Sequence, residues 1–257
     1  YMMNSVSQAP DQHTWKNKLT GLMGSANTRT FYDAWLSNHV SQADIDQIRS
    51  WGFNSVRVPL HYEYFVNSGT PDVWSDQGFA ILDNLISWCK TAGIYVIIDL
   101  HAAPGGQSNN AISDYDSTKP SLWESETNKA KTVALWKKLS ERYKSESWVA
   151  GYDLINEPAW DLPGGVALRD LYGRITDAIR ANGDNHILFI EGNWYSNDYT
   201  GLTPAWDANM VYVFHKYWSN SSTQDIKWIT DFREAQNRPI WCGEHGENSN
   251  DHFTKIV

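Results

Sequence analysis

The sequence predicts an α/β fold, a TIM (β/α)8 barrel of which about six of the eight strands lie in this chain. Short apolar segments alternate with segments of helical spacing from residue 41 onward. The apolar segments are hydrophobic almost throughout, which is typical of parallel strands covered by helices. The strand-helix unit recurs at intervals of roughly 25 to 55 residues, which favours a barrel over an antiparallel sheet.

Each predicted strand is a short run rich in β-branched or other apolar residues. In chain order these runs are Phe53 to Val58, Ile94 to Leu100, Val149 to Ile155, Ile187 to Ile190, Met210 to Phe214 and Ile240 to Cys242.

The predicted helices lie between these strands and repeat apolar residues at helical spacing. Gly52 and Gly93 stand where a helix C-cap is expected for two of them. The helices are Gln42 to Trp51, Gly78 to Thr91, Glu126 to Tyr143, Val166 to Ala181 and Thr223 to Gln236.

The two ends of the chain do not continue this pattern. Tyr1 to Asn38 is polar and loop-like with no convincing first strand, and Val257 follows what resembles the opening of a helix. We therefore expect two barrel strands to be missing, with a doubly wound sheet as the structural alternative. No linker, charge block or low-complexity tract divides the sequence, so residues 1–257 are predicted to form a single domain.

The composition indicates a protein that acts on a neutral ligand. The net charge is −9 and no basic cluster is present, which argues against nucleic acid or an anionic membrane as a partner. No apolar run reaches the roughly 20 residues that span a bilayer. Fourteen Trp and thirteen Tyr exceed what a core commonly needs, and flat rings suit the apolar faces of sugars. Cys89 and Cys242 are expected to be buried thiols.

Polar residues follow or end several predicted strands, on the face where barrel enzymes carry their catalytic groups. They are Arg57, His101, Asn156 with Glu157, His215 and Glu244. A single such residue is readily explained as a cap or surface group. Five strand ends with polar groups together indicate an active site.

Two carboxylates that face each other across a barrel mouth can divide the work of cleaving an acetal between sugars. Glu157 and Glu244 are the candidates, and this chemistry needs no cofactor and no metal. Asn156 is placed to hydrogen-bond a sugar 2-hydroxyl. Arg57 is expected near Glu244, where its charge would keep that carboxylate ionised.

The residues resemble one enzyme family. The segments GFNSVRVP, GIYVIIDLHAAPGGQ, GYDLINEP, VYVFHKYW and IWCGEHGE look like successive strand blocks of glycoside hydrolase family 5, the retaining cellulase-like enzymes. The resemblance covers roughly residues 41 to 250.

The resemblance implies a role for each matching residue. Glu157 would be the general acid/base and Glu244 the nucleophile, with Asn156 beside the acid. His215 matches the histidine near the acid/base, and Tyr217 matches the tyrosine that hydrogen-bonds the nucleophile. Arg57 and His101 would support the site. The family's first strand and its final strand with a subsite Trp are not found in this chain, which leaves a partner chain as one way to complete the barrel.

Further residues are predicted from their positions in loops after strands. Trp123, Trp160, Trp194 and Trp218 are candidates for stacking on sugar rings, and His245 for a substrate contact. Glu191 also ends a strand and is the strongest rival of the two catalytic glutamates, although a supporting role fits it better.

The alternatives come from other functional classes. His61, His101, His215 and His245 would be the ligands if the site held a metal, but no H-x-H or H-E-x-x-H pairing is present. A non-catalytic carbohydrate-binding barrel fragment has no need for two strand-end glutamates. Within the family, the segment from Gly105 to Leu122 favours an endo-β-1,4-glucanase, with exo-β-1,3-glucanase or β-mannanase as alternatives. The resemblance also implies a secreted or extracellular protein, although no signal peptide is visible in this chain.

Overall fold

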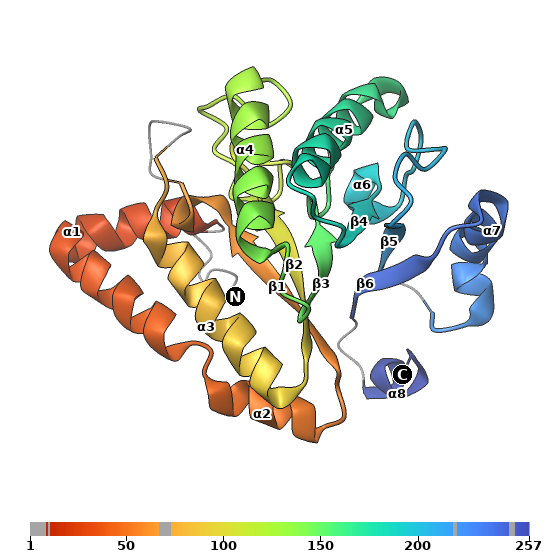
Figure 1. Ribbon diagram of the computed structural model, residues 1–257. Helices are drawn as coiled ribbons and strands as arrows, with labels where there is room; N and C mark the ends of the chain where they lie inside the picture. Colours follow the sequence, from red (N-terminus) through yellow and green to blue (C-terminus); the bar gives the residue numbers. More distant parts are fainter. Residues whose placement is uncertain (1–8, 10, 67–72, 218–219, 247–249, 257) are drawn as a thin grey trace.

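A computed structural model describes residues 9, 11–66, 73–217, 220–246 and 250–256 of the chain. Its described elements alternate between strands and helices from residue 42 onward (Figure 1). The predicted order of strands and helices is therefore confirmed.

The strands form one parallel sheet in the described part of the chain. They are β1 (Ser55–His61), β2 (Tyr95–Ala102), β3 (Val149–Asp153), β4 (Ile187–Glu191), β5 (Met210–Tyr217) and β6 (Ile240–Gly246). Neighbours in the sheet follow chain order from β1 to β6, and every pair is parallel. A doubly wound sheet would reverse its strand order in the middle, so that alternative is wrong. The sheet has the form of a partial barrel in which β1 and β6 are edges among the described residues.

The helices cover the outer face of this sheet (Figure 1). The principal ones after the first strand are α3 (Asp76–Ala92), α4 (Glu126–Tyr143), α5 (Val166–Ala181) and α7 (Lys227–Gln236). Helix α4 lies beside α5, and α2 (Gln42–Ser50) lies beside α3. Gly93 ends α3 with φ of 72°, a left-handed conformation that favours glycine, as its expected C-cap role requires. Short elements complete the chain: η2 (Tyr62–Tyr64), η3 (Ala111–Ser113), η4 (Pro163–Gly165), α6 (Asn193–Ser196), η5 (Thr223–Ile226) and α8 (Asn250–Ile256).

The N-terminal segment differs from the prediction. Residues expected to be loop-like form helix α1 (Gln12–Asn38), which is interrupted at Gly24 where φ is 81°. The Asp11 carboxylate accepts a hydrogen bond from the Thr14 amide and so caps the helix start. Only Leu19, Thr28 and Tyr32 of this helix are buried. A helix that buries so few side chains has no apolar stripe, and the stripe is the signal that sequence periodicity detects.

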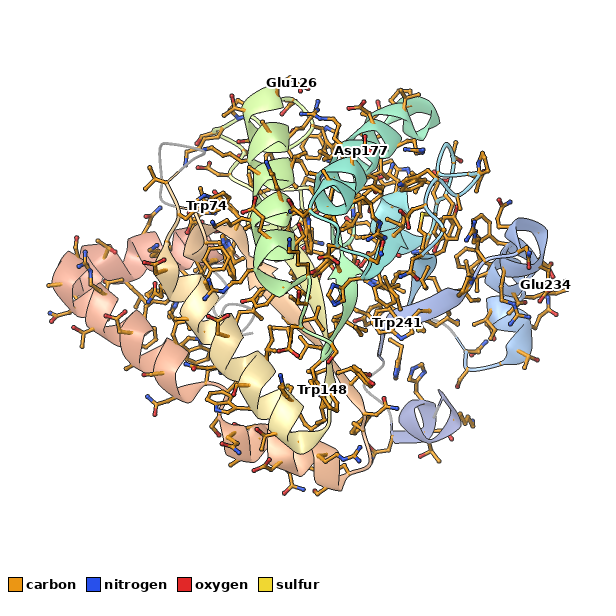
Figure 2. The ribbon with its side chains drawn as sticks, in the orientation of Figure 1. Trp74, Glu126, Trp148, Asp177, Glu234 and Trp241 are labelled. Carbon is orange, nitrogen blue, oxygen red and sulfur yellow. The ribbon has the colours of Figure 1, made fainter. Side chains whose placement is uncertain are left out.

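Side chains alternate between the two faces of each strand and form separate clusters. The larger cluster fills the space between the sheet and the helices. A smaller cluster lies on the inner face, where Ile97, Phe189 and Val213 are buried and Trp241 packs on Phe189 with ring centroids 5.1 Å apart. Trp241 is labelled in Figure 2. At Gly151, a Cβ atom would come within 2.8 Å of the Phe189 ring, so this close packing requires glycine.

The inner face changes from apolar to charged toward the carboxyl ends of the strands. Two residues after the inner apolar residues come Asp99 in β2, Glu191 in β4 and His215 in β5. A spacing of two residues keeps each of them on the same face as its apolar predecessor. The charged side chains therefore lie above the inner apolar cluster and share its interior. None of the described helices is long and apolar enough to cross a membrane.

Candidate active site

Arg57 lies at the centre of the charged layer. Its Nε donates to Asp153 Oδ2 at 2.8 Å, its Nη1 to Glu244 Oε1 at 2.6 Å, and its Nη2 to Asn156 Oδ1 at 2.8 Å. The same Nη2 lies 3.0 Å from Glu191 Oε1. A guanidinium carries five N–H donors in a rigid fork, which allows one side chain to bind several carboxylates at once.

The position of Arg57 along its strand was predicted incorrectly. Strand β1 runs on to His61, so Arg57 is its third residue and does not lie at its end. The long side chain reaches the site from within the strand, and 11% of it is exposed. Burial lowers the pKa of Arg57, but Asp99, Asp153, Glu191 and Glu244 together raise it above its ordinary value. Arg57 therefore stays charged.

Glu157 follows β3 in an uncommon backbone conformation. Its φ is 43°, in the left-handed region that a residue with a side chain seldom adopts. The Glu157 amide donates to Glu191 Oε2 at 2.7 Å, which holds the backbone in this conformation. Its side-chain Oε1 lies 2.7 Å from His215 Nδ1. Both contacts direct the carboxyl group toward the strand ends.

Glu244 lies on β6, across the site from Glu157. Besides the bond from Arg57, its Oε2 accepts a hydrogen bond from Tyr217 Oη at 2.9 Å. Burial raises the pKa of Glu244, but the charges of His215, Arg57 and His101 and the Tyr217 hydrogen bond outweigh burial and hold it below its ordinary value. Glu244 therefore stays ionised at a lower pH than a free glutamate does.

The two glutamates are close to each other and share a neighbour. One oxygen of Glu157, one of Glu244 and one ring nitrogen of His215 all lie within 4.8 Å of one another. His215 is almost fully buried, and its Nδ1 lies 3.9 Å from Glu244 Oε2. Carboxyl groups in retaining glycosidases stand roughly 5 to 5.5 Å apart and those in inverting enzymes roughly 6.5 to 9.5 Å apart. The two carboxyl groups of this chain therefore face one common site, with their nearest oxygens at most 4.8 Å apart.

Three buried carboxyl groups lie beneath these glutamates, and two of them, Asp99 and Asp153, were not among the candidate site residues. Asp99 and Asp153 lie within β2 and β3, and Glu191 ends β4 with no exposed surface. Burial raises the pKa of Asp153 well above its ordinary value, as do Glu191 and Asp99, against the opposing effect of Arg57. An Asp inside an otherwise apolar strand, as in the segments IIDL and YDLI, is the sequence signal that could have identified the first two.

His101 and Asn156 belong to the same charged layer as Arg57. His101 Nδ1 is 2.8 Å from Asp99 Oδ2. Burial lowers the pKa of His101, but Asp99 outweighs burial and raises it. Asn156 is fully buried, and its Nδ2 has no hydrogen-bond partner among the described residues. A buried donor without a partner is costly, so this amide is suited to a ligand oxygen.

The candidate substrate-binding aromatics have different environments. Trp194 is 51% exposed and lies on the left-handed turn α6, where Trp194, Tyr195 and Ser196 all have positive φ. Trp160 is partly buried against Tyr115, with ring centroids 5.3 Å apart. Trp123 is buried and donates its indole N–H to Gln107 O at 2.9 Å, so it packs inside the protein and presents no open ring face. Trp218 lies outside the described residues.

The histidines considered as metal ligands do not converge on one point. His215 lies beside Glu157, His101 beside Asp99, and His61 Nε2 is 2.9 Å from Asp114 Oδ2. His245 is exposed on β6 near His252, with ring centroids 5.9 Å apart. Each of these four histidines thus has a different neighbour.

The chain is similar to known proteins of one enzyme family. The family model described as Cellulase (glycosyl hydrolase family 5) matches residues 11–256. A Beta-xylosidase from Phanerodontia chrysosporium is 33% identical over 77% of this chain and 42% of its own length. A Probable glucan 1,3-beta-glucosidase A from Aspergillus fumigatus is 30% identical over 94% of this chain and 59% of its own. Endoglucanase C from Acetivibrio thermocellus is 27% identical over 69% of this chain and 50% of its own.

A solved structure has the same fold at lower identity. Thermotoga maritima Cel5A, crystallised in mutant form with cellobiose, superposes with a TM-score of 0.68 and 20% identity, covering 84% of this chain and 75% of its own. The chain spans between 42% and 59% of the length of the three curated relatives. The match of the family model across residues 11–256, together with the site geometry, shows that the chain belongs to the cellulase family, glycosyl hydrolase family 5.

Proposed function

We propose that this chain carries the catalytic residues of a retaining β-glycanase, with Glu157 as general acid/base and Glu244 as nucleophile. The observation that carries the proposal is the proximity of the two carboxylates, whose nearest oxygens lie within 4.8 Å, combined with their different partners. Glu244 is held ionised by Arg57 and Tyr217. Glu157 pairs with His215, which can share a proton with it.

The reaction would proceed in two steps. Glu244 attacks the anomeric carbon while Glu157 donates a proton to the departing sugar oxygen, which gives a glycosyl ester on Glu244. Glu157 then removes a proton from water, and the water releases the sugar with its original configuration. Each step uses side chains alone, and no cofactor enters the chemistry.

Substrate binding is proposed for the polar and aromatic groups around the pair. Asn156 Nδ2 would donate to a sugar hydroxyl, since this amide group has no partner among the described residues. Trp194 would stack on a sugar ring because its side chain is half exposed beside the loop that follows Glu157. The amide of its neighbour Tyr195 donates to Pro158 O at 3.1 Å, which ties the two segments together.

The substrate class is a β-glucan, and we propose endo-cleavage of β-1,4-glucan as the first candidate. The relative named Endoglucanase C supports it. A second candidate is exo-cleavage of β-1,3-glucan, which is favoured by the 30% identity over 94% of this chain to a probable glucan 1,3-beta-glucosidase.

We propose further that residues 1–257 act as one catalytic domain of an extracellular protein. Pairing of β1 and β6 with additional strands, from this protein or from a partner chain, would close the barrel. The edge positions of β1 and β6 among the described residues support this arrangement.

The experiment compares reducing-sugar release from carboxymethylcellulose, laminarin and mannan by the full-length protein. Endo-β-1,4-glucanase activity predicts release from carboxymethylcellulose and a fall in its viscosity. Release of glucose from laminarin alone would reject that candidate in favour of exo-β-1,3-cleavage. The matched control is Glu244→Gln, which keeps the size of the side chain but removes the nucleophile. Full activity of this variant would reject the proposed roles.

A further inference from the structure

Glu191 occupies a position that neither catalytic role explains. It ends β4, has no exposed surface, and directs both carboxylate oxygens toward partners in the site. Its Oε1 lies 3.0 Å from Arg57 Nη2 and 3.3 Å from His215 Nε2. Its Oε2 accepts the backbone N–H of Glu157 at 2.7 Å.

These partners connect Glu191 to both catalytic glutamates. His215 contacts the Glu157 side chain at 2.7 Å, and Arg57 contacts the Glu244 side chain at 2.6 Å. Glu191 thus contacts His215, which contacts Glu157, and it contacts Arg57, which contacts Glu244. It also contacts Glu157 directly through the backbone.

The backbone contact carries a specific task. A φ of 43° at Glu157 is a strained conformation for a residue with a side chain, and such strain persists only where surrounding bonds enforce it. The Glu191 carboxylate supplies a charge-assisted bond to the Glu157 amide. Gln107 Nε2 supplies a second bond, to the preceding carbonyl of Asn156 at 2.8 Å.

The chemistry of the partners selects a carboxylate at this position. Arg57 Nη2 and the Glu157 amide are donors in every state, and His215 Nε2 is a donor when it carries a proton. An amide side chain would turn an NH2 group toward at least one of these donors. A carboxylate accepts from Arg57 Nη2 and from the Glu157 amide, and it places a negative charge 3.3 Å from His215 Nε2.

Glu191 also determines where the proton of His215 resides. Because His215 Nε2 lies 3.3 Å from the Glu191 carboxylate, the negative charge favours protonated His215, whose Nδ1 contacts Glu157 Oε1 at 2.7 Å. Glu157 gives its proton to the leaving group in the first step and takes one from water in the second step. The proton count of the pair is conserved over one catalytic cycle.

We propose that Glu191 is a positioning residue for the two catalytic glutamates. It holds in place the Glu157 backbone, the proton on His215 Nε2 and the Arg57 guanidinium. The proposal rests on the proposed function of this site. Glu191 itself touches no reacting atom.

The groups that face Glu191 define the expected pH response. Burial lowers the pKa of His215, but the negative charge of Glu191 and the contacts with Glu157 and Glu191 raise it to about 11. Loss of the Glu191 charge removes a large part of that effect, so His215 would lose its proton at lower pH. The titratable and charged groups around Glu191 are Arg57, Asp153, Glu157, Tyr172, Tyr199 and His215.

The first test measures the proton on His215 without reference to activity. The ¹⁵N NMR signals of the His215 imidazole are followed with pH in the full-length protein and in Glu191→Gln. We expect the titration of His215 in the variant to move downward by about one pH unit or more. An unchanged titration would overturn the proposal, whether or not any glycan is cleaved.

The second test measures catalysis on a β-glucan that the native protein cleaves. Glu191→Gln is expected to lower kcat about 100-fold and to move the basic limb of the kcat/KM profile to lower pH. The matched control is Tyr172→Phe, because Tyr172 Oη donates to the backbone oxygen of Glu191 at 2.9 Å and carries no charge. This control is expected to leave both limbs in place. A fall in kcat with an unmoved profile in Glu191→Gln would show a structural role only and overturn the proposal.

A third variant covers a failure of Glu191→Gln to fold. Glu191→Asp keeps the charge but shortens the side chain by one methylene, so we expect a native-like His215 titration with a kcat about 10-fold lower. Native kcat in this variant would overturn the positioning role. If the native protein cleaves none of the glycans while the titration of His215 still shifts in Glu191→Gln, the proposed function fails, but the effect of Glu191 on His215 stands.

Discussion

Replacing Tyr217 by Phe tests how the ionisation of Glu244 is maintained. Tyr217 Oη donates to Glu244 Oε2 at 2.9 Å, while Arg57 donates to the other oxygen at 2.6 Å. The variant removes one hydrogen bond to the charged form and keeps the ring and the arginine. The pKa of Glu244 should therefore rise toward its ordinary value.

The size of the effect follows from the geometry. A hydrogen bond to a charged group contributes about 1.5 to 3 kcal/mol, and one pKa unit corresponds to about 1.4 kcal/mol. Tyr217 is 40% exposed, and solvent competes for its hydroxyl, which favours the lower end of that range. We expect the pKa of Glu244 to rise by about one unit.

The assay is the pH dependence of kcat/KM, whose acid limb reports ionisation of the nucleophile. Tyr217→Phe should move this limb upward by about one pH unit. Tyr95→Phe is the matched control, because Tyr95 is similarly exposed at the opposite end of the strands. An acid limb that stays in place or moves downward in Tyr217→Phe would refute the reasoning.

The same shift has a consequence for stability. The folded pKa of Glu244 lies below its unfolded value, so its ionisation contributes stability above the unfolded pKa. This contribution is lost as the pH falls through the folded pKa. Tyr217→Phe narrows the gap between the two pKa values. Urea unfolding should therefore show a smaller stability loss on acidification in the variant than in the native protein.

Three further predictions concern other parts of the site and sheet. Arg57→Met leaves the buried Asp99 and Glu191 without their guanidinium partner and should lower the free energy of unfolding by about 3 to 5 kcal/mol in urea titrations. A loss below about 1 kcal/mol would contradict the idea that Arg57 compensates the charges of these carboxylates. Glu157→Gln should slow cleavage of glycosides with poor leaving groups by about 100-fold to 10,000-fold, and equal losses for activated aryl glycosides would argue against acid catalysis. Gly151→Ala places a Cβ 2.4 Å from Ile187 O and should lower the thermal midpoint, at a cost of about 1 to 3 kcal/mol. Gly21→Ala is the control that should not lower it, because apart from the neighbouring backbone of its own helix its Cβ would meet no atom within 4 Å.

The barrel-like order of the elements could be predicted because the strands and outer helices carry strong periodic signals. Helices α4 and α5 were predicted with the bounds that the structure gives, since each has an apolar stripe against the sheet. Helix α1 was missed because few of its residues are buried, so its sequence carries no stripe. Its stability depends on contacts distant in sequence, such as the bond from the His13 amide to Asp114 at 2.8 Å.

The candidate site was predicted in part for a similar reason. Glu157 and Glu244 follow apolar runs, so their places, after β3 and in the second half of β6, are visible in sequence. The hydrogen-bond network beneath them is not visible, because Asp99, Asp153 and Glu191 meet only when four strands are aligned. The exposure of the aromatic rings also could not be predicted from the sequence. Trp123 and Trp194 both lie in loops after strands, yet Trp123 is buried and Trp194 is half exposed.

The configuration of the first product tests the assignment of Glu157 and Glu244 most directly. Proton NMR of a β-glucan hydrolysis by the full-length protein is recorded in the first minutes, before the free sugar interconverts between anomers. A retaining pair with nearest oxygens within 4.8 Å predicts that the β-anomer appears first. Initial release of the α-anomer would show inversion and contradict the assignment of Glu244 as the nucleophile.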